Sequence, residues 1–164
     1  PRDEGLSRLE FETIAASGDG DRDLDTSSTY GGNLSGTDDQ AFNAFGFAKT
    51  GLAFGAPISN ILMFRVGGST YPFQGLELTR DLAFTRDLQV GMDVLVFMKM
   101  LESAPIDEAT SSDRYLGIET DFFANWRITS DVLLTLRYGV FFPGKAIDEN
   151  SERHYFFTGI TYSF

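Results

Sequence analysis

The sequence predicts an all-β protein, namely an antiparallel transmembrane β-barrel, and three observations support this fold class. Long segments alternate apolar and polar side chains with a period of two, as strands with two different faces do. Connections between these segments alternate between short and long, and aromatic residues gather near the segment ends. No run of roughly 18 apolar residues, the length that a membrane helix needs, occurs in the 164 residues.

The clearest strand is expected over residues 115–128. Glu119, Asp121 and Arg127 have one parity in this segment, whereas Phe122 and Trp126 have the other. Strict alternation over more than ten residues matches the length of a tilted strand that crosses a membrane. One face of this strand therefore carries charge, and the other can lie in lipid.

The same alternation predicts five further strands. They cover residues 8–13, 61–69, 88–100, 132–142 and 154–164. The connection at 129–131 is short, whereas those at 102–114, 144–153 and about 18–43 are long and polar. Short turns at one end and long loops at the other are typical of outer-membrane barrels.

Two segments leave the number of strands open. If residues 45–56 belong to the long outer loop and residues 71–87 form a connection, the chain has six strands; if both are strands, it has eight. Six strands cannot close a barrel alone, and eight can. We therefore expect residues 1–164 to form one barrel domain or one segment of a larger barrel, with a long acidic outer loop at about 18–43.

Charge is confined to one face of the expected strands. A lipid-facing Arg or Lys would cost ~2–4 kcal/mol at the bilayer midplane, so this face is predicted to line the lumen. The alternative is a soluble β-sandwich binding module with water on the charged face. Strand lengths above five or six residues and aromatic strand ends favour the membrane. The predicted lumen-facing residues are Arg8, Glu10, Glu12, Arg65, Asp93, Lys99, Glu119, Asp121, Arg127 and Arg137.

The net charge of −11 and the absence of a basic stripe exclude a nucleic-acid partner. Alternate positions of the acidic loop carry carboxylates, which are hard oxygen ligands suited to Ca²⁺. An EF-hand would have Gly and Glu where Leu24 and Tyr30 stand, so a solvated acidic loop is the favoured interpretation and Ca²⁺ binding the alternative. The possible ligands are Asp19, Asp21, Asp23 and Asp25.

Catalytic residues are not expected. His154 is the sole histidine, and Ser151 and Asp148 lie near it in sequence without a pattern that would hold them together. No phosphate loop, zinc-ligand spacing or nucleophile elbow occurs. The sequence thus predicts a protein that is not an enzyme and that has no cofactor other than possible Ca²⁺.

The C-terminal text YFFTGITYSF resembles the closing-strand signature that the barrel-assembly machinery reads in outer-membrane proteins, carried here by Ile160, Tyr162 and Phe164. The stretch of about 111–164, with SSDRYLGIETDFFANWRITSDVLLTLRYGVFFPG, is similar to the end of alginate-export-like porins, and ASGDGDRDLD resembles their acidic loop. This resemblance implies the outer membrane of a Gram-negative envelope, a periplasmic C-terminus and a barrel of about sixteen to eighteen strands.

Taken with the opening Pro1, which is unusual after signal cleavage, the resemblance leads us to expect a segment of a longer barrel. The expected function is a porin-like channel for passive diffusion or export of polar solutes. The alternative is a small sealed eight-stranded barrel with a structural or surface-binding role. Expected partners are the lipid bilayer, the barrel-assembly machinery and further strands of the same barrel.

Overall fold

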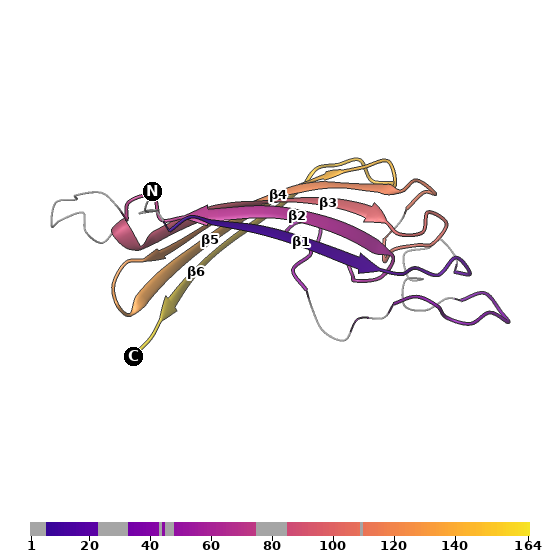
Figure 1. The fold of residues 1–164 in the computed structure, drawn as a ribbon, viewed down its shortest axis with the longest axis horizontal. Coiled ribbons are helices and arrows are strands. Elements are labelled where there is room, and N and C mark those ends of the chain that lie inside the picture. Colours follow the sequence, from indigo (N-terminus) through magenta and orange to yellow (C-terminus); the bar gives the residue numbers. More distant parts are fainter. Residues whose placement is uncertain (1–5, 23–32, 43, 45–47, 75–84, 109) are drawn as a thin grey trace.

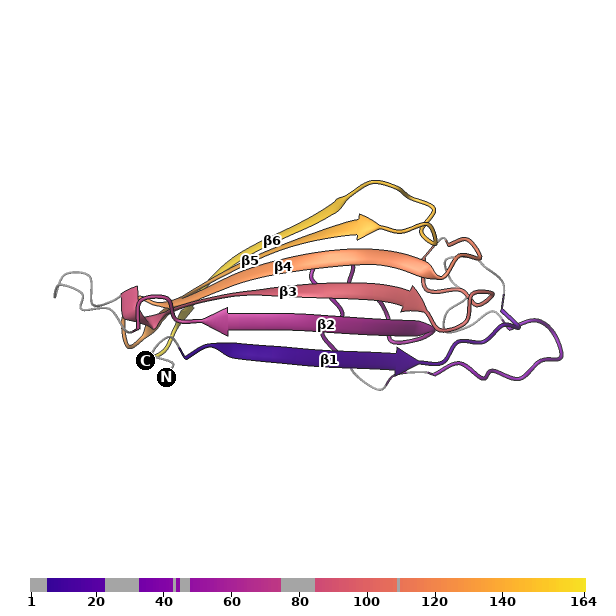
Figure 2. The same ribbon diagram turned by 45° about the horizontal axis from the view of Figure 1, so that its top comes forward.

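The strands of the described residues form one antiparallel sheet. The computed structural model describes residues 6–22, 33–42, 44, 48–74, 85–108 and 110–164. Neighbours along the chain are neighbours in the sheet, whose order is β1-β2-β3-β4-β5-β6. Figures 1 and 2 show this sheet strongly curved. The strands are β1 (Arg8–Ala16), β2 (Ile61–Thr70), β3 (Leu88–Lys99), β4 (Tyr115–Arg127), β5 (Val132–Pro143) and β6 (Arg153–Tyr162).

The six expected strands are confirmed, with small shifts at their ends. β1 continues three residues beyond its predicted end, and β6 stops at Tyr162, before the last two residues. Of the two undecided segments, the described parts (48–56, 71–74 and 85–87) contain turns and a short helical turn but no strand. Residues 45–47 and 75–84 lie outside the described part. The described residues thus agree with the six-strand interpretation.

The two ends of the sheet differ. Residues 17–60, 100–114 and 144–152 connect strands at one end, which we call the loop end (Figures 1 and 2). The opposite turn end holds the 71–87 connection between β2 and β3, the tight connection after β4, in which Thr129 and Asp131 close the turn, and both chain termini. Among the described residues, no helix has the length and apolar character needed to cross a membrane.

The strand register separates two faces of the sheet. On the face that bulges outward, called the convex face, Phe11, Phe64, Val66 and Ile160 are 43–74% exposed. No Asp, Glu, Lys or Arg of the described strands projects from it, because the charged residues all have the opposite parity in the paired strands. The concave face carries every one of these charges. This partition is what a sheet with one side in lipid requires.

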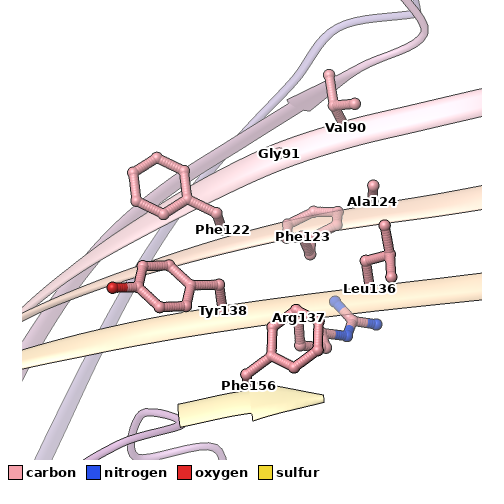
Figure 3. Close-up of a pocket in the computed structure, with 9 residues that line it drawn as sticks. All are labelled: Val90, Gly91, Phe122, Phe123, Ala124, Leu136, Arg137, Tyr138 and Phe156. Atoms are coloured by element: carbon pink, nitrogen blue, oxygen red, sulfur yellow. The ribbon is translucent and has the colours of Figure 1, made fainter. Parts of the chain in front are cut away.

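A shallow apolar pocket of about 360 Å³ lies on this sheet. Figure 3 shows Phe122, Tyr138 and Phe156 around it, with the small Ala124 between larger neighbours. The hollow arises because Ala124 pairs with residues of β3 and β5 whose side chains are longer. An apolar dent of this kind accommodates flexible hydrocarbon without needing any hydrogen bond.

An uncharged convex face leads to a stability prediction. Val94 lies at the centre of β3 on this face, between Val66 and Thr120. We expect Val94→Arg to lower the free energy of unfolding by ~2–4 kcal/mol, because the guanidinium would be placed in hydrocarbon. Urea titration of protein refolded into lipid vesicles measures this change.

The matched control is Thr135→Arg, which places the same side chain on the concave face of β5. We expect it to cost less than about 1 kcal/mol. Equal losses in the two variants would show that the convex face does not lie in lipid.

Candidate functional site

The concave face is organised in rows of side chains that run across the strands. Side chains opposite each other in paired strands lie about 4.5–5.5 Å apart at Cβ, so each row is a set of direct neighbours. We name three rows, from the loop end towards the turn end. The first row is Glu12, Arg65, Leu95, Glu119, Phe141 and Arg153. The second row is Glu10, Gly67, Asp93, Asp121, Gly139 and Tyr155. The third row is Arg8, Ser69, Gly91, Phe123, Arg137 and Phe157.

Arg65 is the centre of an ion-pair network on β1–β3. Its Nη1 donates to Glu12 at 3.0 Å, and its Nη2 donates to Glu10 at 3.0 Å and to Asp93 at 2.9 Å. The other oxygen of Asp93 accepts from Lys49 Nζ at 2.5 Å. Only 14% of the Arg65 side chain and 2% of the Asp93 side chain are exposed. The charges in this half of the concave face therefore largely neutralise one another.

Glu119 holds a segment of chain against the sheet. Residues 48–58, called the inward segment, lie on the concave side of the sheet, below it in Figure 1 and behind the strands in Figure 2. The fully buried Glu119 carboxylate accepts the backbone N–H groups of Leu52 at 2.5 Å, Ala53 at 2.7 Å and Phe54 at 2.8 Å. Successive N–H groups that converge in this way form an anion-binding nest. The carboxylate thus gives a hydrogen-bond acceptor to three partly buried amides.

Gly51 makes this approach possible. Its φ is +95°, a conformation that side chains rarely adopt. A Cβ atom on Gly51 would also lie only 2.6 Å from a carboxylate oxygen of Glu119. Both the backbone turn and the contact therefore require glycine at this position.

The inward segment also packs on the sheet through apolar side chains. The ring of Phe54 stacks on Phe141 with centroids 4.3 Å apart and meets Phe97 edge-on at 5.0 Å. These residues join a buried cluster near the loop end, which includes Ile61 and Met63. At this end the concave side of the sheet is consequently packed with side chains.

Lys99 contributes to closing the loop end. Its side chain is fully buried, and its Nζ donates to the carbonyl oxygens of Glu102 at 3.1 Å and Ser111 at 2.5 Å. Asn60 likewise donates to three carbonyl groups of the 100–114 connection. Lys99, predicted to face the lumen, lies on the concave face by register, and loop backbone encloses its ammonium group.

The other predicted residues differ in how they are used. All ten lie on the concave face by register. Of these ten, the residues that form ion pairs with one another in the described structure are Arg8, Glu10, Glu12, Arg65 and Asp93. Asp121 is buried beside Glu119, and neither of its oxygens has a hydrogen-bond partner in the described part of the chain. Arg127 is exposed at the end of β4. The role of this face as a lumen wall stays a prediction.

Sequence reasoning missed Lys49 and the inward segment. Neither lies in a strand, so no periodicity marked them. Two signals were present: Lys49 is the only cation between Arg22 and Arg65, and glycines at positions 51 and 55 flank the apolar triplet 52–54. These features are compatible with a turn, but neither of them identifies Asp93 or Glu119 as the partner of the segment.

Asp19 organises the acidic loop. Its carboxylate accepts the N–H groups of Asp21 at 2.9 Å and Gln40 at 2.8 Å and the side-chain amide of Asn33 at 3.3 Å. The backbone donors Asp21 and Gln40 lower the pKa of Asp19 below its ordinary value of 3.8. Arg22, also buried, binds Asn33 and Asp39.

Ca²⁺ binding in this loop stays a prediction. Asp19 is engaged by N–H donors, Asp21 is exposed, and Asp23 and Asp25 lie outside the described residues. In the part that the structure describes, no group of three or more His, Cys, Asp and Glu side chains could hold a metal ion.

His154 bonds through Nδ1 with the Tyr138 hydroxyl at 2.8 Å.

Comparison with known proteins gives one family. The family model for alginate export matches residues 7–159, which include five whole strands and most of β6. The chain matches no curated protein.

Removing the Glu119 charge should loosen the inward segment. In Glu119→Gln the three amides lose their anionic acceptor, and hydrogen bonds to charged groups contribute about 1.5–3 kcal/mol each at most. We expect hydrogen exchange of the amides at 52–54 to accelerate at least about tenfold, as measured by mass spectrometry of protein in detergent. The control Glu102→Gln removes an exposed carboxylate that pairs with Arg114; it should leave these amides unchanged. Unaltered exchange in Glu119→Gln would refute the anchoring role.

The acidic loop should open at low pH. Because the folded-state pKa of Asp19 is lowered, its stabilisation is complete above 3.8 and is lost as pH falls through 3.8 and through the lower folded value. Exchange protection of the Gln40 amide, corrected for the intrinsic rate, should fall over this window. Asp19→Asn should show low protection already at neutral pH. A flat profile in the unmodified protein would contradict the assignment.

Proposed function

The chain belongs to the alginate export family, and from this we propose that it forms part of a porin-like channel through which polar solutes diffuse or are exported. The family is one of outer-membrane β-barrels that act in transport, and it is not an enzyme family. The chain is accordingly an outer-membrane transport protein. Passive passage of polar solutes is our proposal for how it works.

The observation that carries this proposal is the partition of charge between the two faces. A convex face without ionised groups fits contact with the acyl chains of the bilayer. The concave face offers carboxylates, guanidinium groups and polar side chains, which suit water and polar solutes. In a closed barrel these two faces become the outside and the lumen wall.

Closure requires partners for the edges of the sheet. Among the described residues, β1 and β6 do not pair with each other, so one edge of each is free. Unpaired backbone groups in hydrocarbon cost several kcal/mol each, and membrane barrels therefore have no open edges. We propose that further strands of the same barrel pair with β1 and β6.

Orientation and assembly follow from the ends of the sheet. Short turns lie on the periplasmic side of outer-membrane barrels and long loops outside, so we propose a periplasmic turn end and C-terminus. Ile160, Tyr162 and Phe164 are 64–110% exposed. These side chains are available to the barrel-assembly machinery as the closing-strand signal.

The inward segment would narrow the lumen. It crosses the concave side near the loop end, pinned by Glu119 and packed on Phe141. Below it the lumen wall presents the paired charges of β1–β3 on one side and Arg137 on the other. A solute would pass between these two surfaces, which sort it by size and charge without any moving part.

The sealed eight-stranded barrel gains no support. It would need strands within residues 45–56 and 71–87, and the described residues of both segments form turns. No observation on the described chain favours a structural or surface-binding role over a channel.

Single-channel recording tests the proposal. We expect the full protein containing this chain to conduct ions in planar bilayers. Arg137→Gln should shift the reversal potential in a salt gradient towards cation selectivity, because a concave-face cation is lost. Lys145→Gln removes the same charge from an exposed position of an outer loop and should change the potential less. Absence of conductance would favour the sealed barrel, and an unchanged potential in Arg137→Gln would place this side chain away from the ion path.

A further inference from the structure

Within the described residues no carboxylate forms an ion pair with Arg137, in contrast to three other cations on the concave side. Arg65, Arg153 and Lys49 each form ion pairs. For Arg137 the contacts within the described residues are a long hydrogen bond from Nη2 to Asn125 Oδ1 (3.4 Å) and a position 5.1 Å from the centroid of the Phe123 ring. A guanidinium has five N–H donors. Most of them therefore remain available on a half-buried side chain.

Aromatic rings flank Arg137 on both sides in the third row. Phe123 is its direct partner on β4, and Phe157 is its direct partner on β6. Both rings lie over glycines: a Cβ on Gly91 would be 2.2 Å from the Phe123 ring, and one on Gly159 would be 3.0 Å from the Phe157 ring. The missing side chains let the rings lie close to the sheet, where they form a low apolar floor around the guanidinium.

The floor extends along β6 on the same face. Tyr155 stands two residues before Phe157, and these rings are 38% and 44% exposed. Tyr155 pairs with Gly139 on β5, and Leu52 of the inward segment lies over Gly139. The cation and the exposed rings thus lie directly on the turn-end side of the inward segment, where a solute passing the narrowing would meet them.

We propose that Arg137, Phe123 and Phe157 form a binding subsite for a solute that carries a carboxylate on a planar apolar body, such as an arylcarboxylate. This deepens the proposed function and rests on the concave face being the lumen wall. The forked guanidinium matches a carboxylate in a two-pronged geometry. The exposed face of Phe157 then stacks with the ring of the solute. The cations of the β1–β3 half already have carboxylate partners, whereas Arg137 in the β4–β6 half has no ion pair within the described residues.

Equilibrium dialysis of radiolabelled benzoate against the detergent-solubilised full protein tests the subsite without requiring conductance. We expect saturable binding at neutral pH. Arg137→Gln should weaken it by about tenfold or more, and Arg137→Lys, which keeps the charge but loses the fork, by less. Phe157→Leu should weaken it several-fold. Arg114→Gln, which removes an exposed loop arginine, should leave it unchanged; circular dichroism confirms that each variant is folded.

Competing ligands separate the two parts of the subsite. Acetate has the charge without the ring, and benzyl alcohol has the ring without the charge; both should compete poorly with benzoate. No saturable benzoate binding, or equal binding by Arg137→Gln, would overturn the proposal, and so would acetate competing as well as unlabelled benzoate. Arginine-dependent binding in a protein that conducts no ions would retain the subsite and refute the channel. Conduction of ions without arginine-dependent benzoate binding would retain the channel and refute the subsite.

Discussion

The hydrogen bonds between Glu119 and the amides at 52–54 are the contact on which the arrangement of the concave side depends. A buried carboxylate is costly unless donors surround it, and three successive amides that are partly shielded from water need an acceptor. The carboxylate and the amides therefore offset the desolvation cost of one another. The contact also fixes the position of Phe54, whose stacking on Phe141 completes the apolar cluster at the loop end.

Around this contact the concave face divides into regions of different chemistry. Near the loops it is apolar and filled. In its β1–β3 half three cations, Arg8, Lys49 and Arg65, pair with three carboxylates, so charge is dense but nearly neutral. In its β4–β6 half a cation stands among aromatic rings with no acid partner in the described chain. The sheet thus offers a passing solute two unlike walls, although it is one continuous sheet with a regular register.

The fold class, all six strands and the face on which each charge lies could be predicted from the sequence, because a period of two is a local property of a strand. Lys99 shows the limit of that reasoning. Its parity correctly gives the face, but its burial depends on carbonyl groups of the following loop, which no periodicity encodes. The inward segment was beyond reach for the same reason, since its partner Glu119 lies 66 residues from Ala53. Side-chain contacts over such separations come from the three-dimensional arrangement alone.

That separation has a consequence for the order of folding. Leu52 precedes its acceptor by 67 residues, and the ring that Phe54 stacks on belongs to β5. Closing so long a loop of chain costs entropy that a few hydrogen bonds repay only once their partners are already in place. The inward segment is therefore expected to settle late, although it is synthesised before β4 and β5. Until β4 and β5 are paired, the concave side of the sheet stays open. The inward segment narrows it only after these two strands have formed.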